Sequence, residues 1–113
     1  MTMLSGKGMI LKVFIGESDM CEGIPLYEAI VLEAKKLGLA GATVTRGIMG
    51  FGANTRVIHT AKILRLSEDL PVVVEIVDAE DKVKKLRAFL ETHVKGGLVT
   101  TEEVNILKYS HNG

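Results

Sequence analysis

The hydrophobic positions of the chain predict four strands. Four runs rich in branched aliphatic residues have the length and composition of strands, and glycine or proline lies at or near their ends. These runs are 9–15, 42–48, 71–77 and 98–107. The third run is almost unbroken in its apolar character, which predicts a central strand that is covered on at least one face.

Two other segments repeat apolar residues every three or four positions, as one face of a helix does. Pro25 suits the first turn of the first helix, and Gly38 is its expected stop. Asp78 suits the N-cap of the second, and Gly96-Gly97 ends that segment. The two apolar stripes are Leu26, Ala29, Ile30, Ala34 and Leu37, then Ala79, Val83, Leu86 and Leu90.

The order of elements is therefore strand, helix, strand, long loop, strand, helix, strand. It predicts an α+β fold, a ferredoxin-like βαββαβ sandwich whose four-stranded antiparallel sheet carries two helices on one face. Two helices shield only one face of such a sheet. Because the other face carries branched aliphatic residues, we expect it to meet another copy of the chain.

Composition narrows the function classes. The chain has 113 residues, 47% of them hydrophobic, and we expect one domain, 1–113, with a core at about 9–108 and a loose tail from Tyr109. Fourteen basic and fourteen acidic residues cancel, which gives no overall attraction for nucleic acid. Cys21 stands alone, so no intrachain disulfide forms, and a cytoplasmic location is expected.

Two short motifs resemble a known family. Gly41–Thr45 (GATVT), followed by Gly50-Phe51-Gly52, resembles the second strand and T-loop entrance of PII signalling proteins, and Leu70–Val77 is similar to their returning strand. The heptapeptide Arg46–Gly52 is similar to a closer group, the uncharacterised PII-like family called domain of unknown function 190. This resemblance runs from about residue 10 to 107.

The resemblance implies a PII-like homotrimer with adenine-nucleotide sites in the clefts between subunits. It also implies a T-loop-like arm, at about 50–70, that changes shape with the ligand and docks onto a partner. The predicted nucleotide-binding residues are Thr43, Arg46, Gly47, Gly50, Phe51, Gly52, Glu75, Lys95 and Gly96.

Several of these residues have a second interpretation. The glycines suit either a phosphate-binding backbone turn or a tight turn at a strand end. Arg46 is either a phosphate clamp or one half of a surface ion pair with Glu17 or Glu75. Phe51 fits a packing anchor for the loop more readily than a base-stacking platform.

The charges near the predicted site favour a small nucleotide. Glu75 interrupts an apolar strand and needs a partner, for which Lys95 and Lys108 are candidates by position. The segment Lys95–Gly97 corresponds to the phosphate-wrapping B-loop of PII proteins but is short. The basic residues that follow the last strand in PII are absent apart from Lys108. AMP or ADP therefore fits better than ATP.

The arm predicts a partner-binding loop. Its basic residues are Arg56, His59, Lys62 and Arg65, and its target is an unidentified protein such as a membrane transporter or channel. No nucleophile–base set and no metal-ligand spacing is present, so we expect neither an enzyme nor a required cofactor. Two alternatives stay open: a trimeric interaction module that binds no nucleotide, and a small metal-binding protein of ferredoxin-like fold.

Overall fold

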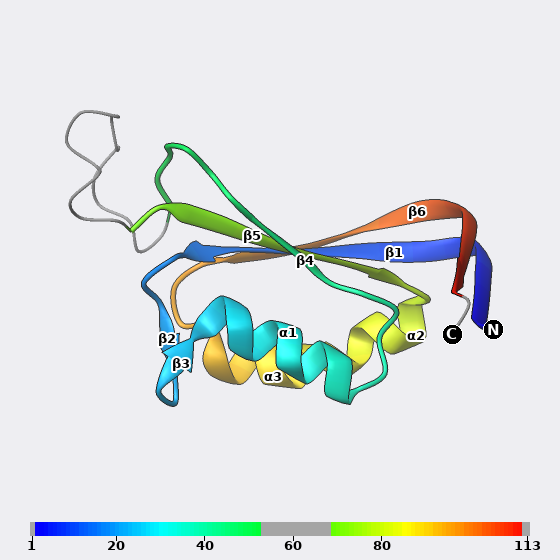
Figure 1. Cartoon of the computed structure of the whole chain (residues 1–113), viewed down its shortest axis with the longest axis horizontal. Coiled ribbons are helices and arrows are strands. Elements are labelled where there is room, and N and C mark those ends of the chain that lie inside the picture. The colour runs from blue at the N-terminus through cyan, green and yellow to red at the C-terminus, as the bar shows by residue number, and fades with distance from the viewer. Residues whose placement is uncertain (1, 53–68, 112–113) are drawn as a thin grey trace.

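The computed structural model describes residues 2–52 and 69–111. Its main feature is a four-stranded antiparallel sheet in the order β4-β5-β1-β6, which lies as one layer above the helices (Figure 1). A two-stranded ribbon, β2-β3, precedes the first helix. The strands are β1 (Thr2–Gly16), β2 (Met20–Cys21), β3 (Ile24–Pro25), β4 (Thr43–Arg46), β5 (Pro71–Asp78) and β6 (Leu98–His111).

The helices cover one face of this sheet, as the sequence predicts (Figure 1). The first is α1 (Leu26–Lys36). The second helical segment comprises α2 (Glu80–Val83), a 3₁₀ turn (Lys84–Leu86) and α3 (Arg87–His93). The predicted α+β fold is confirmed. None of the helices in the described ranges is long and apolar enough to cross a bilayer.

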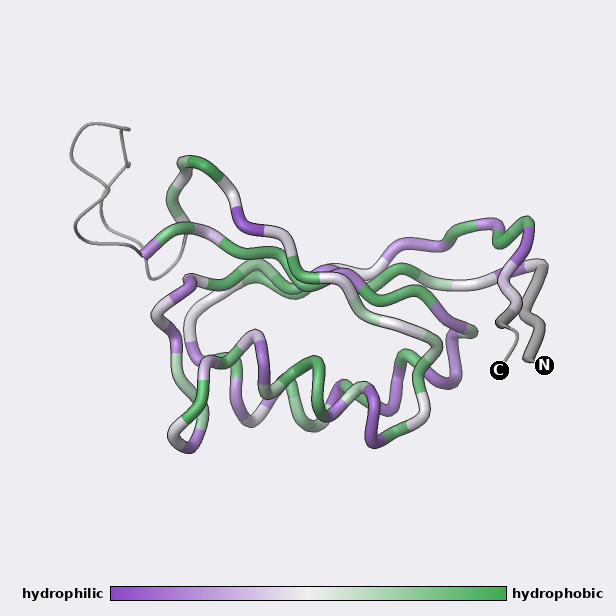
Figure 2. Tube along the Cα trace, in the orientation of Figure 1, coloured by the Kyte–Doolittle hydropathy of each residue, from purple (hydrophilic) through white to green (hydrophobic). Residues whose placement is uncertain are grey.

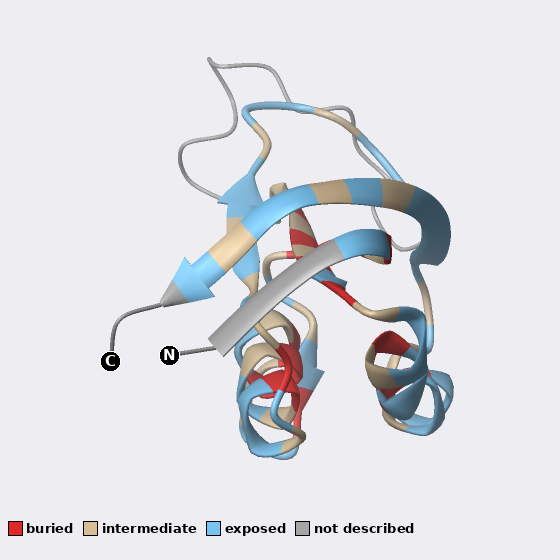
Figure 3. Ribbon diagram, turned by 90° about the vertical axis from the view of Figure 1, so that its right-hand side faces the viewer, coloured by how far each residue is buried: buried red, intermediate tan, exposed pale blue. Residues whose placement is uncertain are grey.

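The core lies between the sheet and the helices, where the buried residues gather (Figure 3). Along β1 and β5, alternate residues point into it, which is the period-two pattern of a strand with one covered face. Figure 2 shows the apolar character of these central strands and of the inner sides of the helices. The largest fully buried side chains are Ile30, Ile76, Leu86, Val13 and Val74.

The other face of the sheet carries no helix, and we call it the open face. Because directly paired residues of an antiparallel sheet share a face, the register assigns its members. Phe14, Val77 and Leu98 on this face are 38%, 37% and 56% exposed, so branched and aromatic side chains lie uncovered there. The open face comprises Ile10, Lys12, Phe14, Thr43, Thr45, Val73, Glu75, Val77, Leu98, Thr100 and Glu102.

The sheet includes both ends of the described part of the chain. β1 starts at Thr2, well before the predicted residue 9. β6 continues to His111, so the prediction of a loose tail is wrong for Tyr109–His111. The two extensions pair with each other, with a register shift between Leu4 and Gly6. This pairing joins segments about a hundred residues apart, and the sequence of either segment alone does not predict which segment it pairs with.

Asp78 does not cap the second helix. It is the last residue of β5, and the N-cap position belongs to Ala79. The residue is 4% exposed, and its carboxylate accepts two backbone hydrogen bonds, from Ala79 N at 2.6 Å and from Ala40 N at 2.8 Å. Asp78 therefore ties the end of β5 to the segment that leads into β4.

Candidate functional site

A groove of about 400 Å³ lies where the end of β6 approaches the segment before β4. β4 and β6 are opposite edges of the sheet, but the β1–β6 ribbon bends toward the helices at its free end (Figure 1). The Tyr109 hydroxyl donates to Ala40 O at 3.0 Å and closes this approach. The groove is lined by Ala40, Gly41, Ala42, Thr43, Glu75, Val77, Ile106, Lys108 and Tyr109.

Three of the lining side chains bear chemistry that suits a polar ligand. Thr43 and Glu75 are directly opposite each other in the β4–β5 register, and Lys108 lines the same groove. Together they offer a hydroxyl, a carboxylate acceptor and an ammonium donor beside the apolar Val77. Of the two lysines considered as partners of Glu75, Lys108 is the one that shares the groove.

Lys12 is a further candidate site residue, which the motifs of the sequence did not identify. In the β1–β5 register Lys12 lies directly opposite Glu75, so β4, β5 and β1 place Thr43, Glu75 and Lys12 in one row on the open face. The signal was present in the sequence: Lys12 is the single charge within 9–15, as Glu75 is within 71–77. Only the strand register shows that the two interruptions meet.

Arg46 lies away from this row. It pairs with Val72, a buried residue, so β4 directs it to the helix side of the sheet. There its Nη2 contacts Glu17 Oε2 at 2.5 Å, which confirms the ion pair that the sequence offered as one interpretation. The Glu17 side chain is 19% exposed and its Oε1 is buried without a hydrogen bond among the described residues. The phosphate-clamp role of Arg46 stays a prediction.

The glycine-rich turn after β4 contacts the start of β5. Gly47 N donates to Pro71 O at 2.7 Å, and a Cβ on Gly47 would lie 2.9 Å from Pro71 Cγ. Gly50 has a φ of +152°, which side-chain-bearing residues rarely adopt. Phe51 is 70% exposed. Because most of the loop that it was expected to anchor lies outside the described residues, the packing interpretation stays a prediction. Gly52 has open space beside its Cα.

Lys95 and Gly96 lie in a different place from Thr43 and Glu75. They belong to the connection between α3 and β6, and β6 begins opposite Phe14, near the end of β1. This is the end of the sheet where β4 also runs into its glycine-rich turn. One chain therefore carries the predicted residues in two groups, the groove beside Thr43 and the loops at this end. The arm residues Arg56, His59, Lys62 and Arg65 lie outside the described residues.

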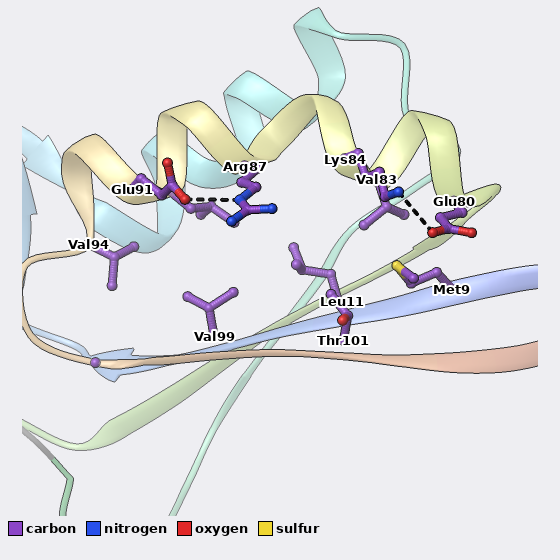
Figure 4. Close-up of a pocket in the computed structure, with 12 residues that line it drawn as sticks. Met9, Leu11, Glu80, Val83, Lys84, Arg87, Glu91, Val94, Val99 and Thr101 are labelled. Atoms are coloured by element: carbon purple, nitrogen blue, oxygen red, sulfur yellow. Dashed lines mark hydrogen bonds and ion pairs between the residues drawn. The ribbon is translucent and has the colours of Figure 1, made fainter.

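A second hollow of about 580 Å³ lies on the helix side, between the second helical segment and β6 (Figure 4). It exists because no helix covers β6, so Val99 is 40% exposed beside Leu11. Both basic residues on its rim are ion-paired: Lys84 with Glu80 at 3.0 Å and Arg87 with Glu91 at 2.9 Å. None of the predicted site residues lines this hollow.

Metal-ligating side chains do not cluster within 2–52 and 69–111, where no three His, Cys, Asp or Glu residues are arranged to hold an ion. Cys21 Sγ lies 3.5 Å from His93 Nδ1, and the His93 ring packs against Phe89 with centroids 4.3 Å apart. The thiol is buried. Its contact with His93 joins the β2–β3 ribbon to the end of α3.

The fold of the chain is PII-like. The chain is similar to a putative PII-like signalling protein from Thermus thermophilus, with a TM-score of 0.62 and 17% identity over 95% of this chain and 94% of that one. It is also similar to the PII-like protein CPII from Thiomonas intermedia, bound to ADP, AMP and bicarbonate. That likeness has a TM-score of 0.59 and 14% identity, over 93% and 91% of the two chains.

Sequence comparison gives the family. The model of the DUF190 family, described as "Uncharacterized ACR", matches residues 8–106, and the chain belongs to this family. A UPF0166 protein of Aquifex aeolicus is 43% identical over 104 residues, 89% of this chain and 94% of that protein. A UPF0166 protein of Methanocaldococcus jannaschii is 36% identical over 103 residues, 90% and 94% of the two chains.

Proposed function

We propose that this protein is a cytoplasmic, trimeric regulatory protein that binds AMP or ADP between its subunits and passes the binding state to a partner protein. The observation that carries the proposal is the groove that joins Thr43, Glu75 and Lys108 at the edge of an uncovered sheet face. The CPII structure with ADP and AMP is a protein of the same fold holding this class of ligand. Catalysis has no part in the proposal.

The separation of the predicted residues supports a site shared between copies. On one chain, Thr43 and Glu75 lie on the open face while the Gly47–Gly52 turn and the loop at Lys95 lie at the end of the sheet. A nucleotide is long enough to need both an apolar base pocket and a separate phosphate site. If a second copy covers the open face, its glycine-rich loops supply the phosphate site that the first chain's groove lacks.

The charges at the groove favour few phosphates. Lys108 is the basic residue that lines it, and Glu75 contributes a negative charge beside it. Each added phosphate raises the negative charge that the site must neutralise, and the short loop at Lys95 offers one further cation. AMP and ADP are therefore the favoured ligands over ATP.

Isothermal titration with AMP, ADP and ATP, together with thermal melting, tests the proposal. We expect heat from AMP or ADP and a rise in melting temperature, because a ligand that binds only the folded state stabilises it. Lys108→Ala should weaken binding, whereas Lys84→Ala, on the ion-paired rim of the other hollow, should leave it unchanged. No heat and no melting shift at millimolar nucleotide would refute nucleotide binding.

One observation favours a second function, a trimeric interaction module without nucleotide. Ile48, Met49 and Phe51 in the turn after β4 are 89%, 52% and 70% exposed. Exposed apolar side chains that lie together in one segment are typical of protein-contact surfaces. Its partner would be a protein such as a membrane transporter or channel. A blank nucleotide titration, combined with loss of a purified partner's binding on Phe51→Ala, supports this function over the first.

A further inference from the structure

Two of the three charged residues on the open face are half-buried, and the chain itself leaves both unpaired; the third, Glu102, is exposed. Lys12 on β1 and Glu75 on β5 are directly opposite in the register and both are half-buried. Neither side chain makes a hydrogen bond or an ion pair within 4.0 Å to another of the described residues. The two ion pairs of the second helical segment, by contrast, are closed within the chain.

The surroundings of the two charges are apolar. In the row of paired residues next to theirs, the strands β5, β1 and β6 place Val73, Phe14 and Leu98 on the same face. In the row on the other side, Ile10 pairs with Val77 on one strand and with the exposed Glu102 on the other. Around the polar row Thr43–Glu75–Lys12–Thr100, the open face is therefore mainly apolar at its centre, with Thr45 and Glu102 at its two edges.

When another molecule covers this surface, each of the two charges needs an opposite charge as a partner. A half-buried ammonium or carboxylate that loses its remaining water without gaining an opposite charge opposes association. A second copy of the chain brings both signs in one row, so it offers a carboxylate for each lysine and a lysine for each carboxylate. A purely apolar partner surface supplies an opposite charge to neither residue, and a singly charged surface supplies one to only one of them.

We infer that Lys12 of one copy pairs with Glu75 of a neighbouring copy, and that this pair sets how the open faces associate. The inference rests on the assembly in the proposed function and adds the residues that specify it. Because Glu75 also lines the groove, the pair connects the interface with the ligand site. Lys12 holds Glu75 from the neighbouring copy while Thr43 and Lys108 lie beside it in its own chain.

Charge reversal tests the inference, with native mass spectrometry and light scattering as the measurements. Lys12→Glu and Glu75→Lys each place like charges at the contact, and each should weaken assembly by roughly 100-fold in midpoint concentration. The decisive sample is a co-expressed mixture of the two single variants, one carrying a length tag. If the contact joins copies, a mixed trimer has two attractive contacts and one repulsive contact, whereas each variant alone has three repulsive contacts. Mixed assemblies should therefore form at concentrations where each variant alone stays monomeric.

The control is the pair Lys84→Glu and Glu80→Lys, which reverses the same charges on the helix side and should leave assembly unchanged. Circular dichroism checks that each single variant is folded. For a variant that does not fold, Lys12→Met with Glu75→Gln, which removes both charges, serves as the second variant and should still assemble.

The outcomes separate the two proposals. A wild-type protein that stays monomeric up to millimolar concentration overturns both the assembly and the pair. Wild-type assembly with no mixed species from the two single variants overturns the pair alone, because an intrachain contact is not restored by mixing. Single variants that assemble as well as the wild type also overturn it.

Discussion

Replacing Asp78 with Asn tests how the groove is held in place. Asp78 is 4% exposed, and its two carboxylate oxygens accept from two different backbone N–H groups, Ala79 at 2.6 Å and Ala40 at 2.8 Å. Asn has the same shape but one acceptor oxygen, so one N–H group must face the new amide NH₂. A buried donor without a partner, together with the lost charge assistance, lowers the free energy of unfolding by about 2–4 kcal/mol.

The measurement is urea unfolding followed by circular dichroism, at one protein concentration because assembly adds to stability. Such a loss corresponds to a fall in melting temperature of roughly 10–20 °C for a domain of this size. Asp81→Asn is the matched control: it is exposed in the first turn of α2, and its loss should stay below about 1 kcal/mol. If the two variants unfold alike, Asp78 does not hold the segment from Ala40 to Thr43.

Two further predictions concern packing. Gly97→Ala should lower the free energy of unfolding by about 1–3 kcal/mol, because the new Cβ would lie 2.7 Å from the rigid Phe14 carbonyl oxygen. Thermal melting measures this, with Gly52→Ala as the control, since that Cβ meets nothing within 4 Å. Leu86→Ala should lower it by about 2–5 kcal/mol, because the side chain is 0% exposed; Leu107→Ala, 85% exposed, should change it little.

The element order was predictable because it depends on local patterns. The stripe from Leu26 to Ala34 and the alternation along Pro71–Asp78 each reflect one covered side, and both are confirmed. The Arg46–Gly52 heptapeptide supported the same fold independently, because it resembles a PII-like family. The match of that family's model to residues 8–106 confirms the resemblance.

The register and the approach of distant segments were not predictable. Strand pairing depends on residues tens of positions apart, so nothing in the segment around Lys12 shows that Glu75 lies opposite. The groove depends on Tyr109 reaching Ala40, a contact across 69 positions. The choice between the two interpretations of Arg46 depended in the same way on where β4 ends relative to Glu17.

The two faces of the sheet differ in how far one chain alone buries their apolar side chains and pairs their charges. On the helix side, aliphatic residues such as Val13 and Ile76 are buried and the charged rim closes its own ion pairs. On the open side, Phe14 and Leu98 stay exposed and two opposite charges lack partners. Stability is therefore largely a property of the helix side, and we place the proposed function on the open side.

A ligand that touches two copies must also strengthen their association, by the same factor by which association strengthens ligand binding. For this protein the proposal makes that coupling measurable. ADP should lower the midpoint concentration of assembly, and dilution should weaken ADP binding in parallel. In Lys12→Glu both quantities should change together, because the variant acts on assembly and Lys12 does not line the groove. Nucleotide affinity that stays constant while Lys12→Glu dissociates the assembly would show that the site lies within one chain, and the shared-site proposal would be wrong.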